Sequence, residues 1–547
     1  MAERRDILTW PLMRVDGGYN TRVGERLLKP NETRHNRNTE IILGGGVQKP
    51  PGWTPVMNIP FPCQDAFFYR CGDPPACSWE LIVYAFPCLY RIDIEQGTIE
   101  TLKNNLMSTG DPVVCQLREK MFICDGVNTP MIYNGQTITN IVWPPTYPGG
   151  NNKDKLDSVF ARQANPTSDQ VTVPHAAIIY KNRVIAISRE KGRIYMSKAD
   201  NIAEFSDNSG SPIPIDIPVF LDLPTPASFT GLRQVSDGVI LYGLEEMWKL
   251  TGDNIPLPGL PNTFEFRLIN DRLGAVAHKM IEQKDDNDHY FMSRYGLYDL
   301  QQAENFDKER PGGRSYKIQN EFDALGAGSM RRSRMFAVPN KGQLWITTPR
   351  RRTHLYLDKI WKLNYAVNEE DENANPWSLF EYFGQFTRFD AMFVLPPKND
   401  VYCINDTTIY KNTGNSYFNS SPIQMEYEWP PVNFNHPGRP KGILDYIIRY
   451  YTSTGANIFL GGTWDHGGGG TTFINLPAIL SSTAGSAGYG TASGDGYTAS
   501  SAFLSNVVKI PPTGGTQGDA FKVRLSHHSA VEDLIIYSID VRYTIRV

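Results

Sequence analysis

Short runs of apolar and aromatic residues recur along most of the chain, separated by polar stretches rich in Gly, Asn, Asp and Pro. Seven of these runs place an aliphatic residue or Met directly before Tyr or Trp. The gaps between the seven aromatic residues range from 43 to 63 positions, so a segment of about fifty residues repeats with variable loops. The seven are Tyr90, Tyr133, Tyr195, Trp248, Tyr298, Trp361 and Tyr410.

A second β-prone run precedes each of these aromatic residues. Residues 81–84 (LIVY) precede Tyr90, for example, and residues 238–242 (GVILY) precede Trp248. Gly, Asn, Asp or Arg lies between the two runs, where a chain reversal needs small or polar residues. Each repeat therefore contains a predicted β-hairpin.

A repeat of this length is typical of a β-propeller, since one blade of four short strands and its turns uses about 40 to 50 residues. We predict an all-β protein with a propeller of six or seven blades over residues 64–414. Each repeated aromatic residue is expected on an inner or middle strand, packed against the next blade. The alternative is a set of unrelated β-sandwiches that share aromatic strand ends.

The pattern changes near Pro422. Residues 441–451 (KGILDYIIRYY) and 533–547 read as strong strands, with a segment rich in Gly, Ser, Thr and Ala between them. We predict a C-terminal β-sandwich over residues 415–547 with a Gly-rich insertion at 464–501. Residues 1–63 form a predicted N-terminal arm and docking segment.

The Gly-rich insertion gains little from burial and loses much backbone freedom on ordering. It is therefore expected to move or to be held by a neighbouring chain. An exposed loop without a role is the alternative. Its glycine run is Gly467, Gly468, Gly469 and Gly470.

Composition excludes several classes of protein. The chain has 547 residues, 40% hydrophobic and 12% aromatic, which suits a turn-rich soluble β protein. Its net charge of -4 argues against a protein that coats nucleic acid, so contact with double-stranded DNA is expected to be transient. No apolar run approaches the roughly 18 residues of a membrane helix, so no membrane insertion of its own is predicted.

Candidate chemistry is sparse. Residues 285–289 (DDNDH) lack the Gly and distal Glu of a calcium loop, and the acidic run at 369–372 reads as a solvated loop. The seven cysteines form no C-x-x-C pair, which favours reduced thiols over zinc ligands. No nucleophile motif or phosphate loop is present. We predict a protein that is not an enzyme and has no cofactor, no metal and no catalytic residue.

Six arginines fall within 22 residues around a predicted strand at Trp345. Arginine pairs with phosphate or with carboxylates of another subunit, so the set predicts either a surface that faces DNA or a contact between subunits. The six are Arg331, Arg332, Arg334, Arg350, Arg351 and Arg352.

Several short motifs follow one another in a fixed order near the start of the chain. They are Gly17, Gly18 and Asn20 in GGYN, residues 28–32 (LKPNE), Asn38, residues 44–46 (GGG) and residues 51–53 (PGW). Thr33 and Pro50 depart from the Ala and Arg that usually accompany these motifs. A second group of motifs, further along the chain, includes residues 180–183 (YKNR), 193–197 (RIYMS) and 247–252 (MWKLTG).

This order resembles the tail nozzle or hub proteins of short-tailed bacteriophages, which include packaged-DNA stabilisation proteins. The resemblance implies a structural protein of the virion tail, assembled in the host cytoplasm as a homohexamer below the portal and adaptor rings, around the DNA exit channel. Tail fibres are further implied partners, and Gly17, Gly18 and Asn20 belong to the implied assembly arm. The resemblance also makes the glycine run at residues 467–470 a candidate gate that narrows the channel before ejection. A receptor-binding adhesin and a carbohydrate-active propeller enzyme are the alternatives.

Overall fold

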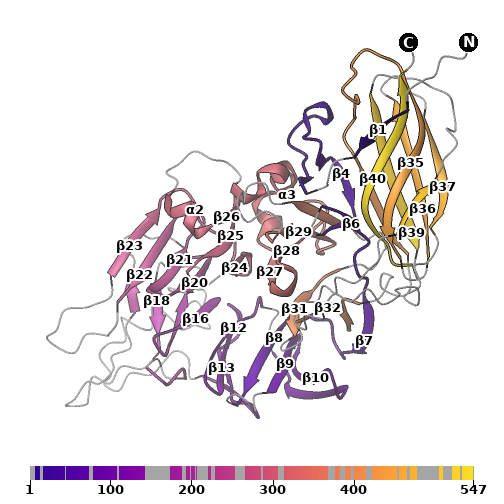
Figure 1. The fold of residues 1–547 in the computed structure, drawn as a ribbon. Helices are drawn as coiled ribbons and strands as arrows, with labels where there is room; N and C mark the ends of the chain where they lie inside the picture. The colour runs from indigo at the N-terminus through magenta and orange to yellow at the C-terminus, as the bar shows by residue number, and fades with distance from the viewer. Residues whose placement is uncertain are drawn as a thin grey trace, which may run out of the picture.

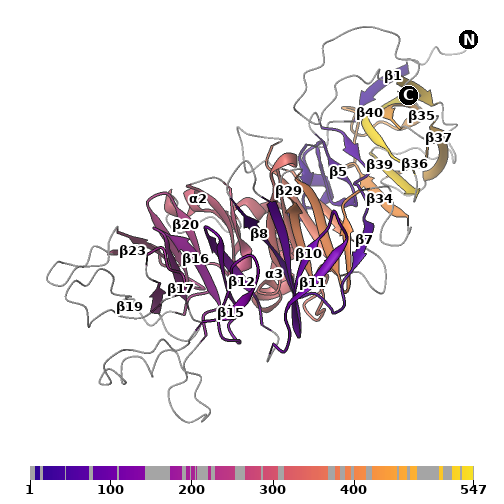
Figure 2. The same cartoon turned by 90° about the horizontal axis from the view of Figure 1, so that it is seen from below.

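The computed structural model forms two β-rich units, a propeller-like unit of small sheets and a C-terminal unit of two larger sheets (Figure 1). Seen from below, the C-terminal unit stands at one side of the propeller-like unit, beside β7 (Figure 2). The described residues are 7–12, 16–42, 45–72, 78–106, 110–141, 173–187, 193–197, 199–203, 205, 220–222, 228–252, 265–284, 287–305, 313–366, 376–381, 388–395, 399–413, 422–452, 455–464, 469–476, 504–508, 520–529 and 532–545.

Seven small antiparallel sheets follow one another in chain order around a common centre (Figure 1). The first four sheets each have four strands. These are β8 (Asp65–Cys71), β9 (Ser78–Ala85), β10 (Cys88–Asp93) and β11 (Thr98–Lys103); β12 (Val113–Leu117), β13 (Lys120–Cys124), β14 (Met131–Tyr133) and β15 (Ile138–Asn140); β16 (Ala176–Tyr180), β17 (Arg183–Ile187), β18 (Arg193–Met196) and β19 (Phe220–Asp222); and β20 (Gly231–Val235), β21 (Gly238–Tyr242), β22 (Met247–Thr251) and β23 (Glu265–Asn270).

The fifth sheet has three strands, because helices follow β26 in place of a fourth strand. The last three sheets contain β24 (Ile281–Gln283), β25 (His289–Ser293) and β26 (Gly296–Asp299); β27 (Arg334–Val338), β28 (Gln343–Thr348), β29 (Lys359–Asn364) and β30 (Trp377–Glu381); and β31 (Ala391–Leu395), β32 (Asp400–Asn405), β33 (Thr408–Lys411) and β7 (Thr54–Asn58). The intervening helices are α2 (Leu300–Asn305), η3 (Gly313–Ile318) and α3 (Gln319–Met330).

The predicted hairpins are the second and third strands of each sheet. In the fourth sheet, for example, β21 and β22 pair with Leu241 opposite Trp248. Every residue of β21 is buried, which explains its continuous apolar run, because neighbouring sheets cover both of its faces. The all-β prediction with repeated small antiparallel sheets is confirmed.

All seven repeated aromatic residues lie on the third strand of their sheets and are buried. Each packs against the preceding sheet, not against the next one as the sequence predicted. The Tyr133 ring lies 4.7 Å from the Tyr69 ring of the first sheet, and Trp361 shares a core cluster with Tyr290 and Met292 of the fifth. Large rigid rings thus fill the wedges between neighbouring sheets.

The seventh sheet combines the two ends of the propeller-like unit. Strand β7 pairs antiparallel with β33, so that Met57 lies opposite Ile409. The predicted division at residue 63 is therefore wrong at this point, since β7 belongs to the seventh sheet. Adding the last strand from the N-terminal side closes the circle of sheets.

The C-terminal unit contains a six-stranded and a five-stranded sheet around one hydrophobic core. Apolar residues alternate with polar ones along its strands, as in residues 521–529, whose buried positions face that core. The first sheet contains β38 (Leu504–Val508), β35 (Lys441–Tyr451), β40 (Ile535–Ile545), β6 (Val47–Gln48), β5 (Glu40–Ile41) and β1 (Ile7–Pro11). The second contains β37 (Gly469–Leu476), β36 (Ala456–Trp464), β39 (Phe521–Ser529), β34 (Ile423–Glu428) and β4 (His35–Arg37).

The N-terminal segment therefore supplies strands to both units instead of extending as a separate arm. Between β1 and β4 it also forms β2 (Gly18–Tyr19), η1 (Glu25–Leu27) and β3 (Glu32–Thr33). Ile41, Val47 and Leu12 belong to the core of the C-terminal unit. A segment that completes other sheets needs no core of its own.

Three predictions from the sequence concern residues that lie partly or wholly outside the described part of the chain. Gly467 and Gly468 lie outside the described residues, whereas Gly469 and Gly470 begin β37 and pair with β36, so the predicted loop is wrong for these two. The acidic run at 369–372 also lies outside the described residues, as do Asp285 and Asp286. Within the described part of the chain, no helix is long and apolar enough to span a membrane.

The packing of the third strands predicts a large stability loss on replacing Trp361 with Ala. The Trp361 side chain is 1% exposed and contacts the rings of Tyr19 and Phe322. Losing a buried indole costs about 3–5 kcal/mol of unfolding free energy, measured by urea denaturation. Trp79→Ala is the matched control, because Trp79 is 38% exposed and should cost about 1 kcal/mol. Equal losses in both variants would contradict this account of the core.

Candidate functional site

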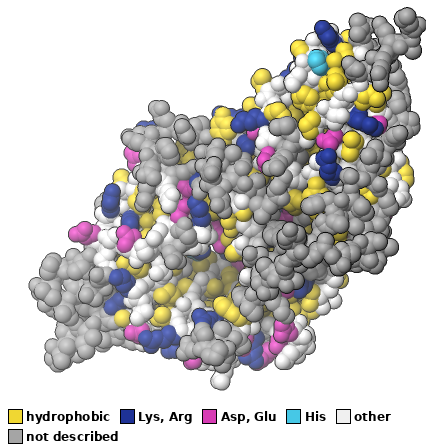
Figure 3. All heavy atoms as spheres, viewed as in Figure 1, with side chains coloured by type: hydrophobic (Ala, Val, Ile, Leu, Met, Phe, Trp, Pro, Cys, Tyr) yellow, Lys and Arg dark blue, Asp and Glu magenta, His cyan; other side chains and the backbone are white. Residues whose placement is uncertain are grey.

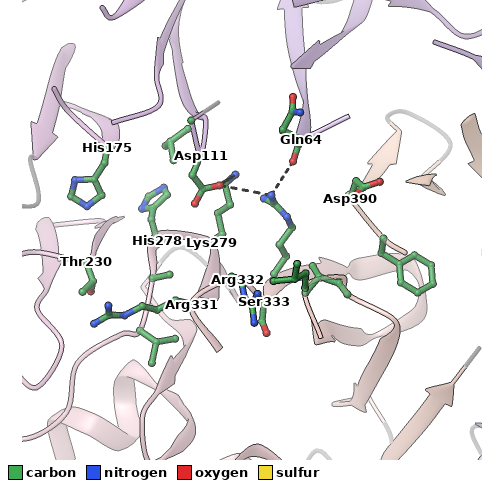
Figure 4. Close-up of a pocket in the computed structure, with 18 of the residues that line it drawn as sticks. Gln64, Asp111, His175, Thr230, His278, Lys279, Arg331, Arg332, Ser333 and Asp390 are labelled. Atoms are coloured by element: carbon green, nitrogen blue, oxygen red, sulfur yellow. Dashed lines mark hydrogen bonds and ion pairs between the residues drawn. The ribbon is translucent and has the colours of Figure 1, made fainter. Parts of the chain in front are cut away.

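A cavity of about 790 Å³ lies where the seven sheets meet (Figure 4). Most of its lining comes from the short segments that enter the first strand of each sheet. Their side chains are mostly polar because they border the open cavity at which the first strands converge. The polar residues of the lining include Gln64, Asp111, His175, Thr230, His278, Lys279, Arg334 and Asp390.

Four charged side chains form a network across this cavity. The Lys279 Nζ lies 2.5 Å from the Asp111 carboxylate and also pairs with Asp65. Arg334 donates to the same Asp65 carboxylate at 2.8 Å and to the Gln64 carbonyl at 2.9 Å. The four side chains come from four different sheets or their entry segments, so the network joins sheets one, two, five and six.

A second ion pair lies at the seventh sheet. Arg388 Nε is 2.7 Å from the Asp390 carboxylate, and Arg388 also pairs with Asp406. The Asp406 backbone N–H donates to the same Asp390 carboxylate at 2.7 Å. Burial raises the pKa of Asp390, against the opposing effect of Arg388. The cations and anions of both groups largely neutralise one another.

Two histidines face the other side of the cavity, near Thr230 (Figure 4). Burial, followed by the nearby charge of Arg233, lowers the pKa of His278 to about 3. His278 is therefore neutral at pH 7. Its Nδ1 accepts the Leu232 N–H at 3.4 Å, which leaves the proton on Nε2.

The arginine set predicted from the sequence is divided between two loops. Arg331, Arg332 and Arg334 line the cavity. Arg334 points inward and is paired with Asp65. The prediction that it faces DNA or another subunit is therefore wrong for this residue. Arg350 pairs with Asp358 on the following loop. Arg351 and Arg352 are exposed and do not line the cavity, whereas Arg331 and Arg332 are exposed and line it.

The predicted arm residues Gly17, Gly18 and Asn20 are buried within their own chain. Gly18 has a φ of +68° and lies against Pro376, where a Cβ would come within 2.7 Å. The Asn20 side chain donates to Glu32 at 2.9 Å. Their contacts position the segment on the sixth sheet, and no partner molecule is needed to explain them.

Asn38 joins the two units directly. It adopts a left-handed φ of 51°, and its backbone N–H donates to Leu379 of β30 at 2.7 Å. Its side chain accepts the Glu381 N–H at 2.9 Å and donates to the Gln424 carbonyl of β34 at 2.9 Å. One buried amide therefore bonds the sixth small sheet to the C-terminal unit.

A buried ion pair lies beside this junction. Glu40 lies 3.7 Å from Lys362 and accepts from Gln343 at 2.9 Å. The Lys362 ammonium also lies over the ring of Trp345, at 3.7 Å. Burial lowers the pKa of Lys362, and Glu40 opposes that shift. Sequence reasoning missed Glu40 and Lys362, because 322 positions separate them and neither belongs to a motif.

Neither a metal cluster nor a catalytic constellation appears from these contacts. Among the described residues, no group of three or more His, Cys, Asp or Glu side chains could hold a metal ion. Basic and acidic side chains are interspersed among the coloured atoms of the face drawn in Figure 3.

The chain matches no protein-family model and no curated protein sequence. Among solved structures, it resembles the extracellular domain of the putative one component system BT4673 from B. thetaiotaomicron, with 9% identity and a TM-score of 0.39 over 83% of this chain and 60% of that one. YCF48 bound to D1 peptide gives 11% identity and a TM-score of 0.35 over 66% and 97% of the two chains. The computationally designed Ika8 protein gives 11% and 0.32 over 65% and 98%.

The axial network predicts a strong effect of Asp65→Asn. The substitution keeps the shape of the side chain but removes the charge that pairs with both Lys279 and Arg334. Leaving buried cations without a full partner should cost about 3–5 kcal/mol in urea unfolding. Glu100→Gln is the control, since its pair with Arg91 is at the surface and should contribute at most about 1 kcal/mol. A stable Asp65→Asn variant would remove the network's structural role.

The pairing of β4 with β34 in the C-terminal unit also predicts a pH dependence. The hydrogen bond with His35 and the charge of Arg524 hold the pKa of Glu426 at about 2, below its usual 4.5, although burial opposes this. A carboxylate with a lowered pKa contributes stability that is complete above pH 4.5 and is lost as the pH falls towards 2. Glu426→Gln should flatten the stability profile over this window, by at most about 1.4 kcal/mol per pH unit. Glu245→Gln, at an exposed pair, should leave the profile unchanged.

Proposed function

We propose that this protein is a structural component of a bacteriophage virion, a tail nozzle or hub that assembles as a homohexamer around the DNA exit channel. In this proposal the seven small sheets are the blades of a seven-bladed β-propeller, and the C-terminal unit is a β-sandwich. The partners are neighbouring copies, the portal and adaptor rings, tail fibres and, transiently, double-stranded DNA. Its location is the tail of the virion.

The observation that carries the proposal is the path of the N-terminal segment. This segment supplies β7 to the propeller-like unit and β1, β4, β5 and β6 to the two C-terminal sheets. Asn38 and Glu40 add hydrogen bonds and an ion pair between the units. Because strands and bonds of one segment join the two units, force applied to one unit is transmitted to the other. This property suits a static part of a tail.

The charged network favours a DNA path outside the propeller axis. Asp65, Lys279 and Arg334 connect different sheets across the cavity, so a strand of DNA would have to break these contacts to pass. In a hexamer the channel instead lies between the six copies. Arg351 and Arg352 are exposed and remain candidates for facing that channel or a neighbouring copy.

The two alternative functions, a carbohydrate-active enzyme and an adhesin, would require different features of the protein. A glycan hydrolase requires two carboxyl groups placed on either side of a sugar. The carboxylates at the axis, Asp65, Asp111 and Asp390, are each committed to a lysine or arginine. An adhesin would use the rim and is expected to be trimeric.

Electron microscopy of the purified full-length protein tests the proposal through symmetry. We expect closed rings with six-fold symmetry. Monomers at micromolar concentration, or a trimer that binds glycans on an array, would contradict it. Hydrolysis of a host surface polysaccharide by the purified protein would favour the enzyme instead.

A further inference from the structure

Two positive charges at the axial cavity have no counterion. Lys279 and Arg334 are balanced by Asp65 and Asp111, and Arg388 is balanced by two aspartates. The remaining cations of the lining are Arg331 and Arg332, and no carboxylate of the described residues pairs with either guanidinium.

The loop that carries these two arginines is well anchored. The Arg331 N–H donates to the Ala327 carbonyl at 3.0 Å, which continues the last turn of α3, and the Arg332 N–H donates to Ser329 at 3.1 Å. Ser333 is buried and also bonded to Ser329. Both arginines are exposed residues on a turn whose backbone is held by these bonds. The Arg332 guanidinium also donates to the His354 carbonyl at 3.1 Å, which leaves its other N–H groups for an anion.

From this arrangement we infer that the axial cavity is a binding site for a small anion carrying a phosphate or carboxylate group, held by Arg331 and Arg332. Guanidinium groups match both anions, because their N–H donors are arranged as a fork. Figure 4 shows Arg331 extending toward the side of the cavity that carries Thr230 and His278.

The rest of the lining complements such a ligand. His278 is neutral and carries its proton on Nε2, so it can donate a hydrogen bond without adding charge. Leu355 and Tyr356, which are 72% and 56% exposed, supply apolar surface in the same cavity. A volume of about 790 Å³ falls in the range of pockets for small molecules, and is too small for a DNA duplex.

The site does not depend on the proposed virion role. A hexameric ring could form with an empty axial cavity, and a monomer could still bind an anion. Symmetry in the electron microscope tests the first idea, and ligand titration tests the second, so failure of one leaves the other intact.

Isothermal titration of the full-length protein with inorganic phosphate and, separately, with citrate tests the site. The titrations use about 0.15 M salt, which screens loose attraction to exposed charges. We expect saturable binding of at least one probe, with a dissociation constant of about 1 mM or lower. Arg331→Gln combined with Arg332→Gln should weaken it by about tenfold to a hundredfold.

The matched control is Arg267→Gln combined with Arg272→Gln. It removes the same charge from exposed arginines that do not line the cavity, and should leave affinity unchanged. Urea unfolding of both double variants confirms that each is folded. The inference is overturned by absence of binding at 10 times the expected dissociation constant, about 10 mM, by equal loss in both variants, or by competition from duplex DNA at equal phosphate concentration.

Discussion

The circle of small sheets closes through the antiparallel pairing of β7 (Thr54–Asn58) with β33 (Thr408–Lys411). Each small sheet covers its neighbours, so an open arc would leave the first and seventh sheets with an uncovered apolar face. The core between them contains Tyr90 from the first sheet and Phe393 from the seventh. One hydrogen-bonded strand from the start of the chain holds these distant parts together.

The same N-terminal segment then determines how the C-terminal unit is attached. Because β7 is held in the seventh sheet, the residues before it must cross the surface of the sixth sheet to reach the C-terminal strands. Gly18 fits this path because a Cβ would clash with Pro376. Asn38 then bonds to both units, and Glu40 pairs with Lys362 of the sixth sheet. Removing either member of this buried ion pair would leave the other charge without compensation.

Closing a circle of sheets also decides the character of its centre. First strands that converge cannot all end in apolar residues without exposing them to the axial cavity, and polar ends must find partners. Asp65 meets this demand by accepting from Lys279 and Arg334 at once. Charges that are left over, as at Arg331 and Arg332, become available to a ligand.

The repeat, its β-hairpins and the burial of residues such as Trp248 and Tyr298 could be predicted from the sequence, because these depend on local alternation and on turns between adjacent strands. The sequence could not show that Arg334 is paired inside while Arg351 is exposed, that the rings pack on the preceding sheet, or that residues 54–58 close the seventh sheet. Those outcomes depend on contacts between positions hundreds of residues apart, such as Met57 and Ile409, and no local pattern records which distant partner a strand or a charge will meet.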